Sequence, residues 1–164
     1  MFVVDTNVLV YAANQDAPEG EACLELLNAW RTQAVPWYST WPILYELLRV
    51  TTHPRVFPRP LSLAQAWRFV EALLATPNLR ILVPTPRHAQ VAAAVFGEVP
   101  RLAGSVLHDL HTVVLMREHG VRRIYTRDAD FRRFSDIEVV DPLAGGSAGQ
   151  SGLARRRPPA PSKR

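Results

Sequence analysis

Four carboxylates stand at positions where an acidic side chain is unusual: Asp5, Glu46, Asp109 and Asp128. Asp5 and Asp128 each follow a short apolar run that predicts a strand, so both belong at the carboxyl edge of a sheet, where open α/β folds bind ligands. Glu46 and Asp109 each have apolar residues three before, one after and four after them, which puts both on the apolar face of a predicted helix. An unpaired charge there is costly. We expect the four acids to converge on one cleft, at the switch between the first strand and the strand preceding Asp128.

Each acid also has a purely structural explanation. Asp5 suits the N-cap of the helix that follows it, and Asp128 suits the cap of a short helical turn. Glu46 has Arg49 three residues on, a spacing at which a salt bridge forms on a helix. Asp109 fits the partly exposed flank of its helix. Each position alone is therefore ambiguous, and the case for a site depends on the four occurring together.

Carboxylates gathered in one cleft require a cation, because two unit charges about 4 Å apart repel by roughly 4 kcal/mol at an effective dielectric near 20. Oxygen ligands suit Mg²⁺, with Mn²⁺ as a substitute. His108 and His111 flank Asp109 but form no paired zinc-ligand spacing, so we expect them to be solvated or to touch substrate. Such a site lowers the pKa of water and neutralises a phosphodiester during in-line attack, leaving a 5′-phosphate and a 3′-hydroxyl.

The elements that position these acids alternate in the way that favours βαβ units and a parallel sheet. Predicted strands cover residues 1–4, 35–38, 80–83, 123–126 and 137–140. The first predicted helix starts at residue 7, and the third runs from a cap at Ser39 or Thr40 to residue 50. The other predicted helices cover residues 21–30, 62–75, 87–95 and 105–119, and Gly120 ends the last of them. The fold class we expect is α/β, a three-layer α/β/α sandwich with a central parallel sheet.

The 164 residues suit a single domain, and charge divides the chain in two. Residues 144–164 are rich in Gly, Ser, Ala, Pro and Arg and carry five basic residues without an acid, which predicts a disordered basic tail. Residues 1–143 then hold 14 basic and 15 acidic side chains and form the predicted domain. The overall charge of +4 is therefore weak support for a nucleic-acid partner.

Lysine is nearly absent, since 18 of the 19 basic residues are arginine and Lys163 lies in the tail. That excludes Schiff-base catalysis, a Walker-type phosphate loop, and the haloacid-dehalogenase-like phosphatases and response-regulator receivers, each of which needs a lysine in the folded core. The lone Cys23 cannot form an internal disulfide, the first residues lack the pattern of a secretory leader, and no apolar run is long enough to span a bilayer. We expect a cytoplasmic protein with no membrane association.

Four short motifs around the acids resemble the PIN-domain ribonucleases of the VapC toxin type. They are VVDTNVLVYA at residues 3–12, ILYELLRV at 43–50, HDL at 108–110 leading to REHG at 117–120, and IYTRDADF at 124–131. The motifs occur in the family's order over residues 1–143. The resemblance implies a PIN-like fold with Asp5, Glu46, Asp109 and Asp128 as metal-binding and catalytic residues. It also implies accessory roles for Asn7 and Thr126.

The resemblance further implies a Mg²⁺-dependent endoribonuclease, frequent homodimers, and inhibition by a cognate antitoxin protein. Asp128 is preferred to Asp130 as the fourth acid because it lies nearer the end of its strand, although Asp130 remains a candidate. The alternatives are a non-catalytic PIN-like domain that binds RNA and a metal-dependent phosphatase acting on small molecules. The sequence does not name the RNA or the antitoxin, or fix the number of metal ions.

The early helices carry more large aromatics than one small core needs. These residues are Trp37, Trp41, Tyr45 and Trp67. We expect at least half of them to be buried between sheet and helices. The others would line a groove for an amphipathic antitoxin segment, whose basic side chain would reach the acidic cleft.

Overall fold

The computed structural model describes residues 1–144 apart from residues 15, 58 and 100–105. Within that part of the chain, one parallel sheet has the strand order β3-β2-β1-β4-β5. Its strands are β1 (Val3–Val4), β2 (Trp37–Thr40), β3 (Leu79–Leu82), β4 (Arg123–Tyr125) and β5 (Glu138–Val140). Chain order runs outward from β1 to β3 on one side and from β4 to β5 on the other. The switch point therefore lies between β1 and β4, as predicted.

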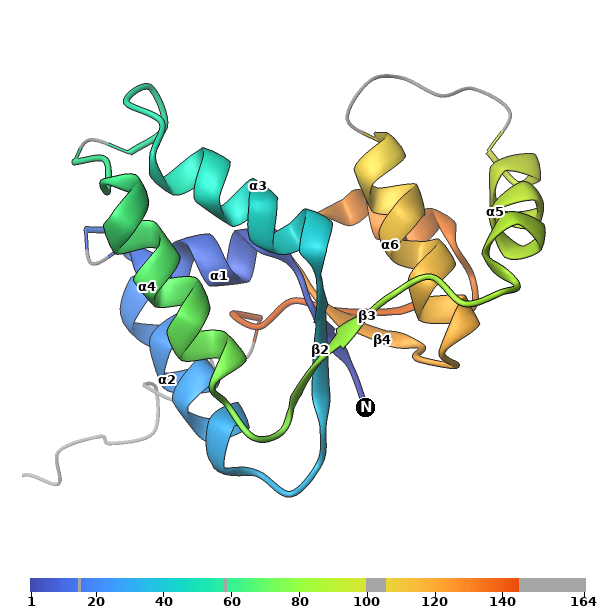
Figure 1. The fold of residues 1–164 in the computed structure, drawn as a ribbon, viewed down its shortest axis with the longest axis horizontal. Helices are drawn as coiled ribbons and strands as arrows, with labels where there is room; N and C mark the ends of the chain where they lie inside the picture. The colour runs from blue at the N-terminus through green and yellow to red at the C-terminus, as the bar shows by residue number, and fades with distance from the viewer. Residues whose placement is uncertain (15, 58, 100–105, 145–164) are drawn as a thin grey trace, which may run out of the picture.

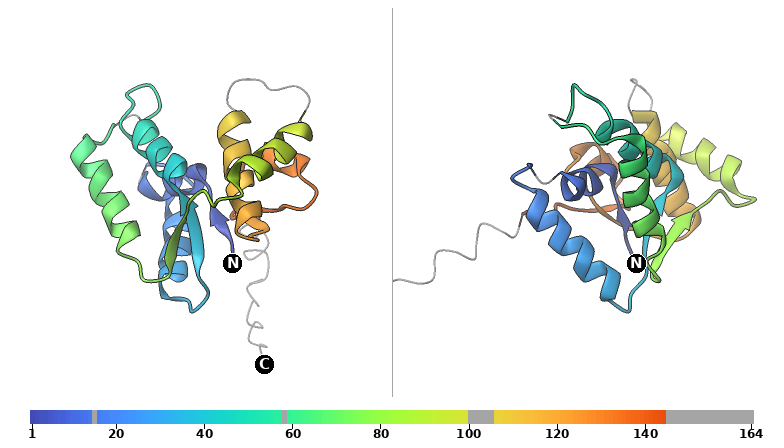
Figure 2. Two further views of the ribbon diagram at one scale, coloured as in Figure 1. Left: turned by 45° about the vertical axis from the view of Figure 1, so that its right-hand side comes forward. Right: turned by 60° about the vertical axis from the view of Figure 1, so that its left-hand side comes forward.

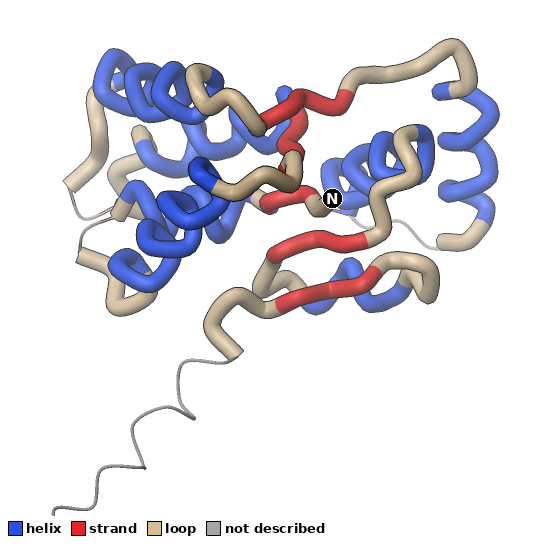
Figure 3. Tube along the Cα trace, turned by 90° about the horizontal axis from the view of Figure 1, so that it is seen from below, coloured by secondary structure: helices blue, strands red, loops and turns tan. Residues whose placement is uncertain are grey.

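Helices cover both faces of the sheet, which confirms the predicted α/β/α sandwich (Figure 1). They are α1 (Thr6–Ala13), α2 (Gly20–Thr32), α3 (Trp41–Thr51), α4 (Leu63–Leu74), α5 (His88–Gly97), α6 (Val106–Glu118) and the 3₁₀ turn η1 (Ala129–Arg133). α1 to α4 gather on one side and α5 and α6 on the other (Figure 2), and the strands lie between the two groups when the molecule is seen from below (Figure 3).

Local sequence signals explain where several helices begin and end. The Thr40 hydroxyl accepts a hydrogen bond from the Ile43 backbone N–H at 3.2 Å, so Thr40 and not Ser39 caps α3, with Pro42 in the first turn where no donor is lost. Gly120 follows α6 with φ of +66°, a left-handed conformation that favours glycine. These caps fix the start of α3 and the end of α6, the two helices that carry Glu46 and Asp109.

The core lies on both sides of the central strands. Among the fully buried side chains are Val3, Val4, Trp37, Ile124 and Leu110. Burial on both faces explains why the central strand β1 reads as a continuous apolar run and not as an alternating one. α6 contributes more residues to this core than any other helix of the described residues, from Leu110 to Met116, so its packing on the sheet begins directly after Asp109.

The predicted elements are all present, with ends displaced by one or two residues. The largest strand shift is in β2, predicted at 35–38 and found at Trp37–Thr40, because Val35 is exposed and Trp37 pairs with Leu79 of β3. The predicted start of the last long helix at residue 105, and nearly all of the predicted tail at 144–164, lie outside the described residues. None of the helices in the described residues has the length and apolar character needed to cross a bilayer.

Candidate active site

The four acids predicted from the sequence line one pocket of about 1080 Å³ at the carboxyl edge of the sheet. Asp5 stands between β1 and α1, and Asp128 follows β4, so the two central strands place them side by side. Glu46 enters from α3 and Asp109 from the first turn of α6. The structure thus brings together residues that are separated by more than 120 positions in the sequence.

Hydrogen bonds hold both oxygens of Asp5 in place. Its Oδ1 accepts from the Thr6 backbone N–H at 2.7 Å, so Asp5 does cap α1. Its Oδ2 accepts from the Thr126 hydroxyl at 2.6 Å and from the Asn7 amide at 2.8 Å. The Asn7 amide also donates to the Thr126 hydroxyl, and its Oδ1 accepts from the Arg127 backbone N–H. Asn7 and Thr126 therefore connect Asp5 to the loop that carries Asp128.

Glu46 is held by two donors of different kinds. Its Oε2 accepts from the Thr6 hydroxyl at 3.1 Å, and its Oε1 lies 3.1 Å from the Arg49 guanidinium. The salt bridge anticipated from the spacing on the helix is therefore present, and the acid still lines the pocket. Thr6 was not among the site residues predicted from the sequence. Its position between Asp5 and Asn7, in a short polar run, is the feature that indicates a place in the site.

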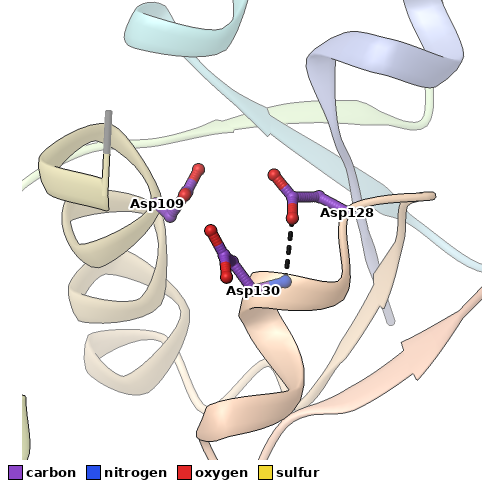
Figure 4. Close-up of side chains that lie close together, drawn as sticks. All are labelled: Asp109, Asp128 and Asp130. Carbon is purple, nitrogen blue, oxygen red and sulfur yellow. Dashed lines mark hydrogen bonds between the residues drawn. The ribbon is translucent and has the colours of Figure 1, made fainter. Parts of the chain in front are cut away.

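Asp109, Asp128 and Asp130 point toward one another (Figure 4). Each offers a carboxylate oxygen within 4.8 Å of those of the other two. Asp128 Oδ1 accepts from the Asp130 backbone N–H at 2.8 Å, and this cap turns η1 so that Asp130 faces α6. Arg133 pairs with Asp130 from the outer side. Asp128 and Asp130 therefore both belong to the cluster, while only Asp128 also lines the pocket.

Burial and mutual repulsion raise the free energy of the ionised carboxylates. Burial raises the pKa of Asp109 to about 7, and the nearby carboxylates of Asp128 and Asp5 add to the effect. Burial also raises the pKa of Asp5 to about 6, although its hydrogen bonds from Thr126 and Thr6 oppose the shift. Burial is the larger cause of both pKa shifts and repulsion between the acids is the smaller one, and a bound cation would offset both.

The donor set fits a hard divalent cation. Within the described residues, the three-membered cluster consists of carboxylates alone, and carboxylate oxygens are the ligands that Mg²⁺ and Mn²⁺ prefer, whereas zinc sites use thiolate and imidazole. His108 lines the pocket near Asp109, while the ring of His111 packs against that of His88 with centroids 5.4 Å apart. Of the two histidines flagged by sequence, only His108 is placed to touch a ligand.

A parallel sheet with this switch point and acidic residues at its carboxyl edge is the arrangement of PIN domains. The model of the PIN domain family matches residues 2–137, so the chain belongs to that family. Ribonuclease VapC48 of Mycobacterium tuberculosis is 32% identical over 145 residues, which cover 86% of this chain and 97% of that relative. The resemblance to VapC-type ribonucleases expected from four short motifs is confirmed.

Two solved structures share the fold at low sequence identity. VapC20 of Mycobacterium tuberculosis, described as a toxin that cleaves the sarcin-ricin loop, is 17% identical with a TM-score of 0.60 over 80% of this chain and 93% of that one. VapBC2 of Rickettsia felis, solved with a DNA fragment from its promoter, is 15% identical with a TM-score of 0.62 over 85% of this chain and 96% of that one. These likenesses support the PIN-like architecture.

Proposed function

We propose that this PIN domain is a metal-dependent endoribonuclease and the toxin of a toxin–antitoxin pair. The observation that carries the proposal is the pocket itself, which is lined by Asp5, Glu46, Asp109 and Asp128. Asp109 and Asp128 also form a cluster with Asp130, in which the carboxylate oxygens lie within 4.8 Å of one another. The chain belongs to the PIN domain family, and the alignment with a ribonuclease relative covers 86% of its length. Both findings support hydrolysis of RNA phosphodiester bonds, the reaction that the resemblance implies.

The ion we propose is Mg²⁺, with Mn²⁺ able to replace it. The residues that would hold it are Asp5, Glu46, Asp109 and Asp128, with Asp130 as an accessory carboxylate. When bound, such an ion lowers the pKa of water and neutralises charge on the phosphodiester. The role of Asn7 and Thr126 is to fix the orientation of Asp5, because both donate to its Oδ2. Thr6 fixes Glu46 in the same way.

A carboxyl group with a pKa of about 7, such as that of Asp109, holds a proton in part of the molecules near neutral pH and releases it when a cation approaches. Arg49 stays largely exposed at the pocket while it pairs with Glu46, so its guanidinium is available to an RNA phosphate. These residues prepare a site that binds a phosphate flanked by an ion and a guanidinium.

The partners we propose are an RNA substrate, a cognate antitoxin and a second copy of this chain. Structural neighbours solved as VapBC assemblies support the antitoxin. RNA as the substrate supports a cytoplasmic location. Residues 1–143 would act as the catalytic domain, and residues 144–164, with their five basic side chains, would add affinity for phosphates.

The experiment is to incubate the purified chain with structured RNA and, separately, with a phosphomonoester, each with Mn²⁺ and with EDTA. We expect RNA cleavage with Mn²⁺, none with EDTA, and no release of phosphate from the monoester. Cleavage that persists in EDTA would contradict the metal site. Hydrolysis of the monoester without RNA cleavage would favour the phosphatase, and binding of RNA without any cleavage would favour the non-catalytic domain.

A further inference from the structure

Two aromatic rings are presented to solvent on α3 beside the acidic pocket. Tyr45 is 62% exposed and Trp41 is 37% exposed. They stand one helical turn apart and pack on each other, with ring centroids 5.9 Å apart and planes tilted by 34°. Large aromatics are normally covered in a folded domain, so an exposed, pre-packed pair is an available binding surface.

This pair is continuous with the candidate active site. Tyr45 directly precedes Glu46 in the chain, and both line the same pocket. Arg49 follows one turn after Tyr45, lines the pocket as well, and keeps 66% of its side chain exposed. α3 therefore contributes an aromatic ring, a carboxylate and a guanidinium to the lining of the pocket, in that order along the chain.

The pocket also has apolar lining on α3 and in the segment after it. Pro42, Val50, Val56 and Phe57 line it together with Tyr45, and Asp5 and Asp128 line it from the carboxyl edge of the sheet. A pocket lined by both carboxylates and apolar, aromatic side chains matches a ligand that joins a phosphate, held through a cation, to a flat ring. A nucleotide within an RNA chain has that composition, and a pocket of about 1080 Å³ leaves room for more than one.

We propose that Tyr45, supported from behind by Trp41, stacks on an unpaired RNA base next to the scissile phosphate, and that Arg49 contacts a neighbouring phosphate. The inference rests on the proposed nuclease function and adds a base-binding subsite to it. A base within a double helix has both faces covered by its neighbours, so the subsite selects single-stranded segments and loops over duplex RNA.

An antitoxin segment is the other possible occupant of these rings, and the structure favours RNA. Of the four aromatics considered for an antitoxin groove, one, Trp37, is buried, and Trp41, Tyr45 and Trp67 are exposed on α3 and α4, so the expectation that at least half would be buried is wrong. Trp67 lies on α4 outside the pocket, and its indole N–H donates to Glu71. The exposed pair that remains, Trp41 and Tyr45, lies beside Glu46 and the guanidinium of Arg49 on α3. Stacking against one base requires such a small platform, whereas an amphipathic helix requires a long apolar groove.

The test compares Tyr45→Leu, which removes the ring, with Tyr45→Phe, which keeps it, and with Trp67→Leu, which removes an exposed aromatic outside the pocket. The full chain without added metal is titrated with a fluorescein-labelled oligouridine and with a labelled RNA duplex, and anisotropy is recorded. We expect Tyr45→Leu to bind oligouridine about 5- to 30-fold more weakly, because stacking on one aromatic ring contributes roughly that much. The Phe variant and Trp67→Leu should match the unmodified chain, and duplex binding should not change.

Cleavage measurements separate this inference from the function on which it rests. With Mn²⁺, Tyr45→Leu should raise the KM for a single-stranded substrate by a similar factor and leave kcat nearly unchanged. If the unmodified chain cleaves RNA but Tyr45→Leu retains its affinity and KM, the stacking subsite is wrong and the nuclease stands. If the unmodified chain cleaves no RNA, both fall. If Tyr45→Leu keeps its RNA affinity but no longer associates with the cognate antitoxin, Tyr45 and Trp41 bind the antitoxin and the inference is wrong.

Discussion

Replacing Asp109 with asparagine should stabilise the metal-free protein at alkaline pH. The folded-state pKa of Asp109 is about 7, against an ordinary value of 3.8, so the unmodified chain loses stability as the pH rises from about 4 to about 7, where the unfolded chain has released this proton and the folded chain still holds it. Asparagine cannot ionise and avoids the loss, which is complete above pH 7. The full difference corresponds to about 4 kcal/mol. Solvent in the open pocket screens the charge, which leaves about 1–2 kcal/mol. That gain raises Tm at pH 8 by about 3–8 °C for a domain of this size.

The assay is thermal unfolding in EDTA from pH 4 to pH 8, followed by the same series with Mg²⁺ or Mn²⁺. The stabilisation by Asp109→Asn should be nearly gone by pH 4, close to the ordinary pKa of 3.8, because little of the pH range over which only the unfolded chain ionises has then been crossed. Added metal should reverse the order, because it stabilises the unmodified chain by mass action. Asp136→Asn is the matched control of opposite sign: the pKa of Asp136 is lowered by its hydrogen bond with Arg117, so this variant should lose stability at neutral pH. A destabilised Asp109→Asn protein at pH 8 without metal would refute the reasoning.

Three further outcomes are expected. Asp5→Asn should abolish RNA cleavage while circular dichroism shows an intact fold, and its Tm should rise less with metal than that of the unmodified chain; full cleavage would remove Asp5 from the site. Leu110→Ala, beneath Asp109 and fully buried, should cost about 2–5 kcal/mol in urea unfolding, and a smaller loss would mean that α6 packs loosely on the sheet. Truncation after Leu143 should weaken RNA binding and flatten its salt dependence without changing turnover at saturating RNA; loss of turnover would give the tail a catalytic part.

The sequence predicted those parts of the fold that depend on local chemistry. Apolar runs, the Thr40 cap and Gly120 specify their elements through contacts within a few residues, and all are found as expected. Strand ends depend on pairing with distant segments, so β1 shrinks to the two residues that pair with β4, Val3 and Val4. The residues of the strand alone do not determine where it begins and ends.

The same division applies to the site. Strand ends and helix faces sufficed to predict that the four acids converge, because a parallel sheet brings its carboxyl ends to one edge. The place of Asp130 depends on how η1 turns after its backbone N–H bonds to Asp128, and the link from Thr6 to Glu46 spans 40 residues. The ordinary structural explanations also hold, since Asp5 and Asp128 cap helices and Glu46 pairs with Arg49. Structural and proposed catalytic roles therefore coexist in the same side chains.

The most direct measurement is the chemistry of the RNA ends left after incubation with the full chain and Mn²⁺, compared with the Asp109→Asn variant. A metal ion held by Asp5, Glu46, Asp109 and Asp128 would activate water for in-line attack, and the products would carry a 5′-phosphate and a 3′-hydroxyl. We expect these ends from the unmodified chain and no cleavage by the variant. Ends carrying a 2′,3′-cyclic phosphate and a 5′-hydroxyl, or undiminished cleavage by Asp109→Asn, would contradict hydrolysis by the clustered carboxylates.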